Sequence, residues 1–152
     1  METFKLSEKF NYFRPGSDSA LAASITKAVE KGEPWVGYYW EPTWIMGKYD
    51  MTLLEAPEYS DEKWDENFGC AFPAVKVTIA VNNKMPETAP DVVEFLKKYK
   101  TSSSLTSEAL AYMQDNNVDT DAAAKWFLQN KEDIWTKWVP ADVAEKVKTA
   151  IQ

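Results

Sequence analysis

The stretch that decides the fold is SDSALAASITKAVEKGEPWVGYYW, residues 17–40. Ser17 or Asp18 can cap the start of a helix, and Gly32 stands where a helix-ending glycine belongs. The apolar residues between them that recur at helical spacing are Leu21, Ile25, Ala28 and Val29. The pattern predicts a helix over residues 18–31. The aromatic, β-prone run at 35–40 predicts a buried strand. A helix followed at once by a strand indicates an α/β fold with a largely parallel sheet.

The segments on either side extend this prediction. Further strands are expected at residues 3–6, 51–55 and 74–81, and residues 57–70 are expected to form a loop. From about residue 82 the chain changes to nearly all helix. The expected helices run from residues 86–90 to about 99, after a cap within 101–104, after Asp119 or Thr120, and from Pro140 onward.

The composition excludes several classes of function. The chain has 152 residues, 45% of them hydrophobic, no histidine and one cysteine. Without histidine, neither a Ser–His nor a Cys–His pair nor a histidine-ligated zinc site can form, so we expect no catalysis and no cofactor. Cys70 is expected to be a packed thiol. The net charge of −7 and the interleaved lysines disfavour a nucleic-acid partner. The N-terminal residues have no signal-peptide pattern, and no stretch is long and apolar enough to span a bilayer.

The densest aromatic segment is WVGYYWEPTW, residues 35–44. It lies at the C-terminal end of a predicted strand, where ligands bind in open α/β sheets. On a strand, Tyr38 and Trp40 share one face and Tyr39 points to the other. A trimethylammonium group has no N–H to donate, so aromatic ring faces are its natural receptor. The alternative is that these rings pack in the core, as aromatic strands usually do.

Three other groups of residues favour structural roles. Carboxylates in the predicted loop could serve acid–base chemistry or bind calcium, but the spacing is not that of an EF-hand, and Lys63 interrupts the run, so a solvated loop is expected. These carboxylates are Glu58, Asp61, Glu62, Asp65 and Glu66. The three C-terminal tryptophans, Trp126, Trp135 and Trp138, are expected in the core, with Trp135 and Trp138 on one helix face. Ser102–Ser104 are expected to cap a helix.

Trp40-x-Pro42-x-Trp44, after an aromatic strand and a helix ending in KGEP, resembles the glycine betaine/proline betaine-binding proteins of ABC transporters. NFGCAFP at 67–73, the following Val75–Val81 segment and the tail ending WTKWV at 135–139 are similar to this family as well. The resemblance covers essentially the whole chain. It implies a type II periplasmic-binding-protein-like α/β fold, with two hinged lobes and a helical C-terminal region.

The resemblance also implies a function and a site. The chain would bind glycine betaine or a related quaternary-ammonium osmoprotectant outside the cytoplasm and deliver it to an ABC transporter permease. Trp40 would be a wall of the aromatic cage, with Trp44 and Tyr39 as neighbours that line or support the pocket. The chain resembles only the later half of the family. Residues 1–75 would then complete the second lobe, and residues 76–152 would return to the first.

Because the earlier half of such a receptor supplies another cage tryptophan and most donors for the carboxylate, the partner could be that half or a swapped second copy. The competing interpretation is a structural or interaction fragment without a ligand of its own. An aromatic sugar-binding module is a further possibility, since sugars also stack on tryptophan.

Overall fold

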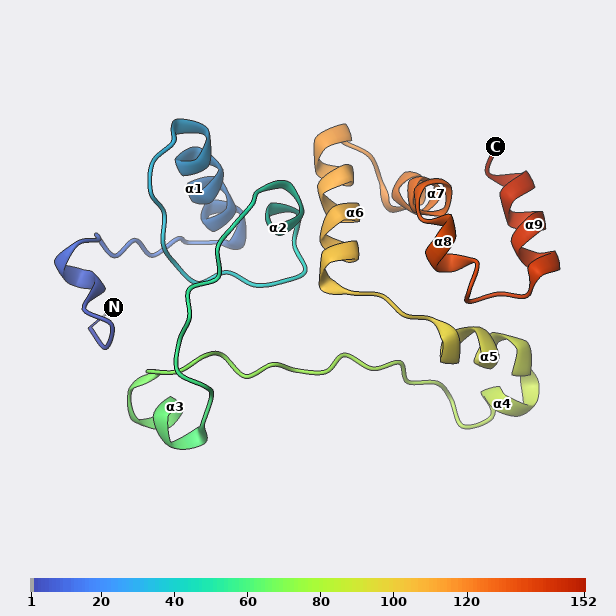
Figure 1. Cartoon of the computed structure of the whole chain (residues 1–152), viewed down its shortest axis with the longest axis horizontal. Coiled ribbons are helices and arrows are strands. Elements are labelled where there is room, and N and C mark those ends of the chain that lie inside the picture. The colour runs from blue at the N-terminus through green and yellow to red at the C-terminus, as the bar shows by residue number, and fades with distance from the viewer. Residues whose placement is uncertain (1) are drawn as a thin grey trace. The chain divides into compact units, whose positions relative to one another are not determined.

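The computed structural model describes residues 2–152 (Figure 1). Over these residues the structure consists of helices and extended segments, without a strand. The helices are η1 (Leu6–Glu8), α1 (Asp18–Lys31), α2 (Trp44–Lys48), α3 (Asp61–Asn67), α4 (Met85–Thr88), α5 (Pro90–Lys98), α6 (Ser103–Asn116), α7 (Thr120–Asn130), α8 (Glu132–Trp135) and α9 (Ala141–Ala150). The chain forms two compact units, the first made of residues up to Trp35 with Met51–Thr78, and the second of Val36–Asp50 with Ile79–Gln152.

Helix α1 has the bounds that the sequence predicts. The Ser17 hydroxyl accepts a hydrogen bond from the Ala20 amide at 3.1 Å, and this satisfies one of the free N–H groups of the first turn. Gly32 ends the helix in the left-handed conformation at φ 65°, and its amide donates to the Ala28 and Val29 carbonyls. Ile25 is fully buried on the inner face of the helix.

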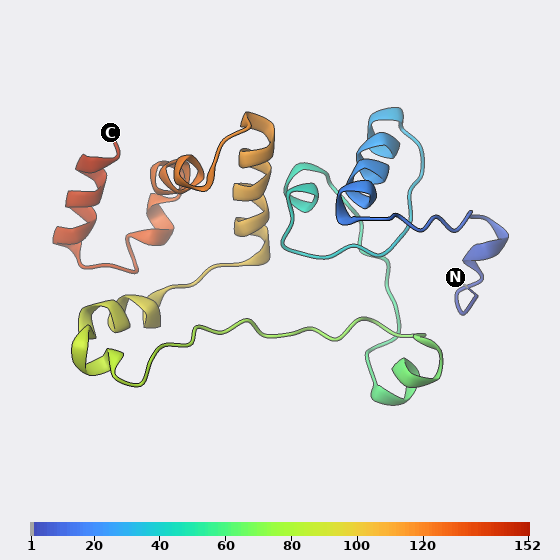
Figure 2. The same ribbon diagram turned by 180° about the vertical axis from the view of Figure 1, so that it is seen from behind.

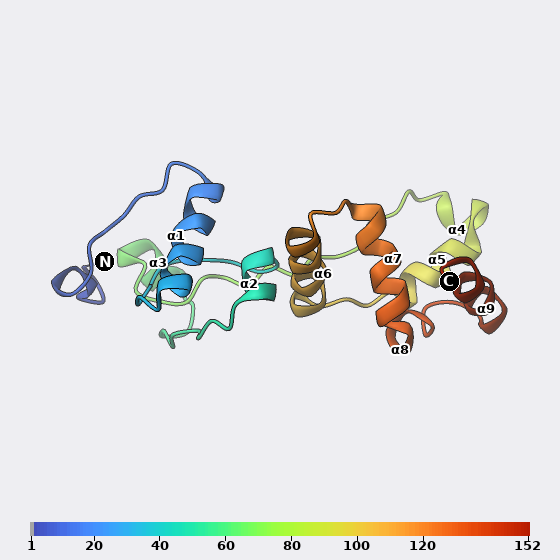
Figure 3. The same cartoon turned by 90° about the horizontal axis from the view of Figure 1, so that it is seen from above.

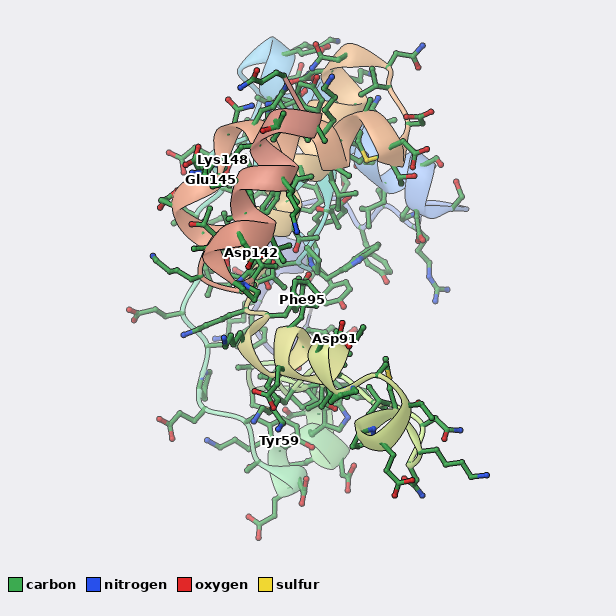
Figure 4. All side chains as sticks on the ribbon, turned by 90° about the vertical axis from the view of Figure 1, so that its right-hand side faces the viewer. Tyr59, Asp91, Phe95, Asp142, Glu145 and Lys148 are labelled. Carbon is green, nitrogen blue, oxygen red and sulfur yellow. The ribbon has the colours of Figure 1, made fainter. Side chains whose placement is uncertain are left out.

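The first unit also contains an aromatic cluster around α3. The Trp64 ring meets the rings of Phe68 and Phe72 edge to face, with centroids 5.1 and 5.0 Å away, and Tyr59 lies 5.9 Å from it. Tyr59 is labelled in Figure 4. The Tyr59 hydroxyl donates to Asp61 at 2.8 Å. This hydrogen bond, with smaller contributions from burial and from the Asp61 charge, raises the pKa of Tyr59 above its ordinary value.

The expected loop at 57–70 is wrong in part, because α3 lies inside it. The Ser60 hydroxyl accepts from the Lys63 amide at 3.3 Å, and Asp61 and Glu62 occupy the first turn, where the helix dipole favours negative charge. The carboxylates Glu58, Asp61, Glu62, Asp65 and Glu66 are exposed, as expected of a solvated segment. Cys70 is buried, which confirms a packed thiol.

The second unit has its core among the C-terminal helices. Trp135 and Trp138 are 3% and 9% exposed, which confirms their expected place in the core. The Trp135 indole donates to the Leu128 carbonyl at 2.8 Å. The partly buried residues packed on this core are Phe95, Phe127, Leu128, Ile134, Val139 and Val147, which come from α5, α7, α8, α9 and the turn before α9 (Figure 3). Trp138 lies beyond the end of α8, so the expected shared helix face for the two tryptophans is wrong.

Trp126 lies at the edge of this unit and is only partly buried. Its ring stacks on Tyr112 of α6 at 4.7 Å, and the Lys131 ammonium lies 5.8 Å from its centroid. Lys131 also pairs with Glu108 of α6 at 2.8 Å. Trp126 therefore joins α6 to α7, and this contact, rather than full burial, is its structural role.

Helices α2 and α6 make the closest contact in the second unit. Ile45 of α2 and Ser107 of α6 are almost fully buried, and the Thr43 amide donates to the Ser107 hydroxyl at 3.2 Å. A Cβ atom on Gly47 would lie 2.0 Å from the Ser107 carbonyl oxygen, so only glycine permits this approach. The ion pairs of the unit, by contrast, lie at its surface. Lys148, for example, pairs with Glu132 at 2.5 Å and with Glu145 at 3.1 Å. Lys148 and Glu145 are labelled in Figure 4.

The predicted strands are extended segments or turns in the structure. Residues 3–6 form a turn that leads into η1, and residues 35–40, 51–55 and 74–81 are extended without a ladder (Figure 2). Their residues favour extended backbone, but a strand also needs a neighbouring strand to accept and donate hydrogen bonds. Over residues 2–152 the predicted α/β character is therefore not confirmed. The expected division of a two-lobed receptor near residue 75 stays a prediction.

Candidate functional site

The candidate site is built on the extended segment before α2. The rings of Tyr38 and Trp40 lie 6.0 Å apart and are nearly parallel, with an interplanar angle of 24°. The rings of Tyr39 and Trp40 are closer, at 4.7 Å and 33°. Trp40 and Tyr39 are half-buried, whereas Tyr38 is 53% exposed. Both tyrosines therefore contact the same indole.

This geometry corrects the expected alternation along the segment. In a flat strand Tyr39 would point away from Trp40, because successive side chains lie on opposite faces. The segment is not held in a sheet, and the Tyr39 ring lies beside the indole instead of on the opposite face. An atom in van der Waals contact lies about 3.5–4 Å from a ring face, so two rings that enclose a cation must lie roughly 7 Å or more apart, well beyond the 4.7 Å between Tyr39 and Trp40. Tyr39 thus supports the Trp40 ring and does not face it across a cavity.

The exit from the segment is tied to the helical unit. The Glu41–Pro42 peptide bond is cis, and Thr43 then caps α2 by accepting a hydrogen bond from the Met46 amide at 3.3 Å. The Thr43 amide donates to Ser107 of α6, and Ile45 is buried. Within five residues after Trp40, the chain is therefore held by both a cap at Thr43 and the buried side chain of Ile45.

Trp44, the first residue of α2, lies at a different place from the Tyr39–Trp40 pair. It lines an open hollow of about 270 Å³ together with residues of α6 and of the turn after it, and neither Tyr39 nor Trp40 is among the lining residues. The other lining residues are Leu110, Met113, Gln114, Asn117 and Val118. Of the three residues expected at the site, the structure thus brings Tyr39 and Trp40 together and leaves Trp44 apart.

The sequence pattern missed two features of this region. Tyr38 was placed on the same face as Trp40 but was not counted as a site residue, although its ring stacks on the indole. The contribution of Leu110 and Met113 to the hollow beside Trp44 also has no local signal, because these residues lie far from Trp44 in the chain. Only the dense run of aromatics indicated the site.

The chemistry available at this site is that of an aromatic surface. A partly buried indole backed by phenol rings attracts a diffuse cation through its quadrupole. Within the part of the chain that the structure describes, no group of histidine, cysteine, aspartate or glutamate residues is arranged to hold a metal ion. In the same part, no helix is long and apolar enough to cross a bilayer.

Comparison with known families assigns the chain. Residues 1–130 match the substrate-binding domain of the ABC-type glycine betaine transport system. The chain belongs to this family. The family that the sequence motifs resemble is thereby confirmed. Proteins of this family have a type II periplasmic-binding-protein fold. No solved structure gives a significant match to the chain.

Two relatives are named for the solutes that they bind. The trimethylamine N-oxide-binding protein of Pelagibacter ubique (strain HTCC1062) is 30% identical over 125 residues, which are 80% of this chain and 39% of the relative. The glycine betaine/carnitine transport binding protein GbuC of Listeria monocytogenes serotype 1/2a (strain 10403S) is 26% identical over 133 residues, or 86% of this chain and 39% of GbuC. The chain therefore spans well under half the length of either relative.

Proposed function

We propose that this chain is part of a receptor for a small molecule that carries a trimethylated nitrogen, and that Trp40 contacts this group. The names of the two relatives point to trimethylamine N-oxide, glycine betaine and carnitine. These three solutes share a nitrogen with three methyl groups, and that nitrogen has no N–H. Hydrogen bonds cannot hold such a head group, and an aromatic face can.

The observation that carries the proposal is the arrangement around Trp40 in a chain of this family. Its indole is half-buried and backed by Tyr39 at 4.7 Å, and the cap of α2 fixes the chain just beyond it. Backing by a second ring holds the indole in one orientation, so little side-chain entropy is lost when a ligand stacks on it. In this proposal Trp40 is the cage wall, Tyr39 supports it, and Trp44 contributes to a neighbouring surface.

The partners follow from the same family. We propose that the receptor delivers its ligand to an ABC transporter permease on the outer side of the membrane. We also propose that the complete cage includes aromatic residues from outside this chain. A complete receptor of this fold would close around its ligand by a hinge motion. Its two lobes would be drawn from residues 1–75 and 76–152 together with the remaining part of the receptor.

The test compares two substitutions of the same kind. Trp40→Phe should weaken glycine betaine binding by about two- to thirtyfold, because a phenyl ring is a poorer cation–π partner than an indole and one contact is worth about 0.5–2 kcal/mol. Trp35→Phe is the matched control: Trp35 lies in the same aromatic run, but its indole N–H donates to Ser24 inside the first unit. Isothermal titration calorimetry measures the affinities on the complete receptor, which contains this chain or one of its two variants together with the rest of the receptor.

A ligand of the same shape that lacks the positive charge completes the experiment. In 3,3-dimethylbutanoate a carbon replaces the charged nitrogen of glycine betaine, so the carboxylate and the three methyl groups remain. We expect this analogue to bind more weakly than betaine to the parent chain and equally poorly to Trp40→Phe. Equal affinity of Trp40→Phe and the parent chain for betaine would show that Trp40 is not a cage wall. Failure of the complete receptor to bind betaine would favour an interaction fragment without its own ligand, and binding of maltose instead would favour a sugar-binding module.

A further inference from the structure

Ser107 is a serine at a position where packing alone would favour alanine. It lies inside α6, on the same face as Ala111 one turn later, and among residues 2–152 it is the one polar residue that is buried. Serine is a poorer helix former than alanine, and burial of a hydroxyl group is unfavourable unless the group is hydrogen-bonded. What the Ser107 hydroxyl binds must therefore offset both costs.

The Ser107 hydroxyl accepts a hydrogen bond from the Thr43 amide at 3.2 Å. The other polar groups of Thr43 are used in capping α2, since its side chain accepts from the Met46 amide at 3.3 Å and its carbonyl from the Gly47 amide at 3.2 Å. Within residues 2–152, the Thr43–Ser107 bond is the first hydrogen bond after Trp40 that joins its segment to another helix. This bond thus connects the segment that carries the indole to α6.

The two helices are in direct backbone contact at the same place. A Cβ atom on Gly47 would lie 3.0 Å from the Cβ of Ala111 and closer still to the Ser107 carbonyl group. Helix backbones that meet in this way cannot slide past each other without a clash. The position of Ser107 relative to the start of α2 is therefore fixed.

Little of the chain lies between this bond and the indole. Only Glu41 and Pro42 separate Trp40 from Thr43, and the ring of Pro42 restricts its own φ angle. A displacement of Thr43 would therefore be passed to the backbone of Trp40, whose half-buried ring is the proposed wall of the cage.

We propose that Ser107 is a positioning residue for the ligand and acts through Trp40. Its hydroxyl holds the Thr43 amide, and Thr43 fixes the point at which the chain leaves the site. Ser107 is 2% exposed, so it is too buried to contact the ligand itself. The inference rests on the proposed contact between Trp40 and the trimethylated nitrogen. Because cation–π attraction requires the cation to lie over the ring face, a poorly held indole should lose this part of the affinity.

Calorimetry on the complete receptor tests the proposal with Ser107→Ala. This change leaves the Thr43 amide without its acceptor and keeps the Trp40 ring. We expect glycine betaine to bind about two- to tenfold more weakly, which is the usual effect of one more side chain that must be ordered on binding. The analogue 3,3-dimethylbutanoate, which lacks the positive charge, should lose less affinity, so the preference for betaine should fall. Partial unfolding of the receptor would instead weaken both ligands by the same factor.

Ala111→Gly is the matched control. Ala111 is buried on the same face of α6, and glycine at this position weakens the helix and removes a buried methyl group but spares the Thr43–Ser107 bond. Urea unfolding should show that Ala111→Gly is at least as destabilised as Ser107→Ala, yet its affinity for both ligands should equal that of the parent. Equal losses of betaine affinity in the two variants would mean that Ser107 acts only through stability, and would overturn the proposal.

A double-mutant cycle tests whether the effect passes through Trp40. In the Trp40→Phe background, Ser107→Ala should weaken betaine binding by a smaller factor than in the parent, because the contact that Ser107 supports is already reduced. The same factor in both backgrounds would mean that Ser107 acts through another residue. Unchanged betaine affinity of Ser107→Ala in the parent background would also overturn the proposal.

Fluorine NMR separates this inference from the proposed function, because it needs no ligand. In a receptor labelled with 5-fluorotryptophan, the Trp40 resonance is the one that Trp40→Phe lacks. Ser107→Ala should shift or broaden this resonance and leave that of Trp35, which is bonded to Ser24 in the first unit, unchanged. An unchanged Trp40 resonance overturns the positioning role even if Trp40 binds betaine. A changed resonance, together with full betaine affinity of Trp40→Phe, would locate the failure in the proposed cage and not in the link between Ser107 and Trp40.

Discussion

At the scale of single residues, Gly47 shows how one missing side chain decides a contact. The α2 backbone approaches α6 so closely that a Cβ at this position would lie 2.0 Å from a carbonyl oxygen and 2.5 Å from its carbon. These atoms belong to the backbone of a helix, so they cannot move aside as the end of a side chain could. The close approach also buries Ser107, whose hydroxyl accepts from Thr43.

We therefore expect Gly47→Ala to destabilise the second unit by about 1–3 kcal/mol, the usual cost of overpacking. The gain in helix propensity of about 1 kcal/mol works against this cost and makes the net effect smaller. Gly16→Ala is the control, because nothing lies within 4 Å of a Cβ at that position. Urea unfolding followed by circular dichroism measures both. A Gly47→Ala variant as stable as Gly16→Ala would mean that α2 does not pack on α6 in this way.

The sequence could not have predicted the role of Gly47. A glycine within a short segment indicates a turn or a bend, and its neighbour Ser107 is far away in the chain. Trp40 is the opposite case, since the density of aromatics around it is visible locally. Its support by Tyr39 was missed, because alternation along an assumed strand placed that ring on the other face.

At the scale of elements, the helix ends depend on short-range hydrogen bonds. Ser102 accepts from the Leu105 amide at 3.2 Å at the start of α6, and Asp119 accepts from the Ala122 amide at 3.0 Å at the start of α7. A cap satisfies backbone donors that have no partner inside the helix. In both caps the amide that donates lies three residues after the capping residue, so the starts of α6 and α7 could be predicted from the local sequence alone.

Ser102→Ala should cost about 1 kcal/mol of stability, because it leaves the first turn of α6 without its acceptor. Ser103→Ala is the matched control, since Ser103 is the first residue inside the helix and is exposed. Thermal unfolding of the two variants, recorded side by side, measures the difference. Equal melting temperatures for Ser102→Ala and Ser103→Ala would contradict a capping role for Ser102.

The extended segments were harder to predict for a physical reason. Alternation in residues 74–81 indicates a preference for extended backbone, and the structure agrees on that point. Whether such a segment becomes a strand depends on a second backbone at hydrogen-bonding distance, and no local pattern specifies it. Helix α3 was missed because its acidic, polar residues were interpreted as a loop, although Ser60 and the acids after it are a helix-start signal.

At the scale of the whole molecule, the two units are interleaved along the chain. The boundary between them is crossed at residues 35–36, 50–51 and 78–79. Contacts between distant residues define each unit, such as the bond from Thr3 to the Asn67 carbonyl in the first and the Thr43–Ser107 bond in the second. A change in composition near residue 82 was visible in the sequence, but the assignment of residues 36–50 to the helical unit was not.

The surface position of the ion pairs in the second unit determines how the protein responds to ionic strength. Each pair contains at least one well-exposed partner, and exposed pairs contribute little to stability. In about 1 M salt the Debye length falls to ~3 Å, so the attraction within these exposed ion pairs is largely screened. The burial of the tryptophan core does not depend on the ion pairs. The melting temperature of the helical part should therefore change little between dilute buffer and molar sodium chloride, and a steep fall would show that charge holds it together. The helical part of this chain would then keep its fold as the salt concentration around it rises.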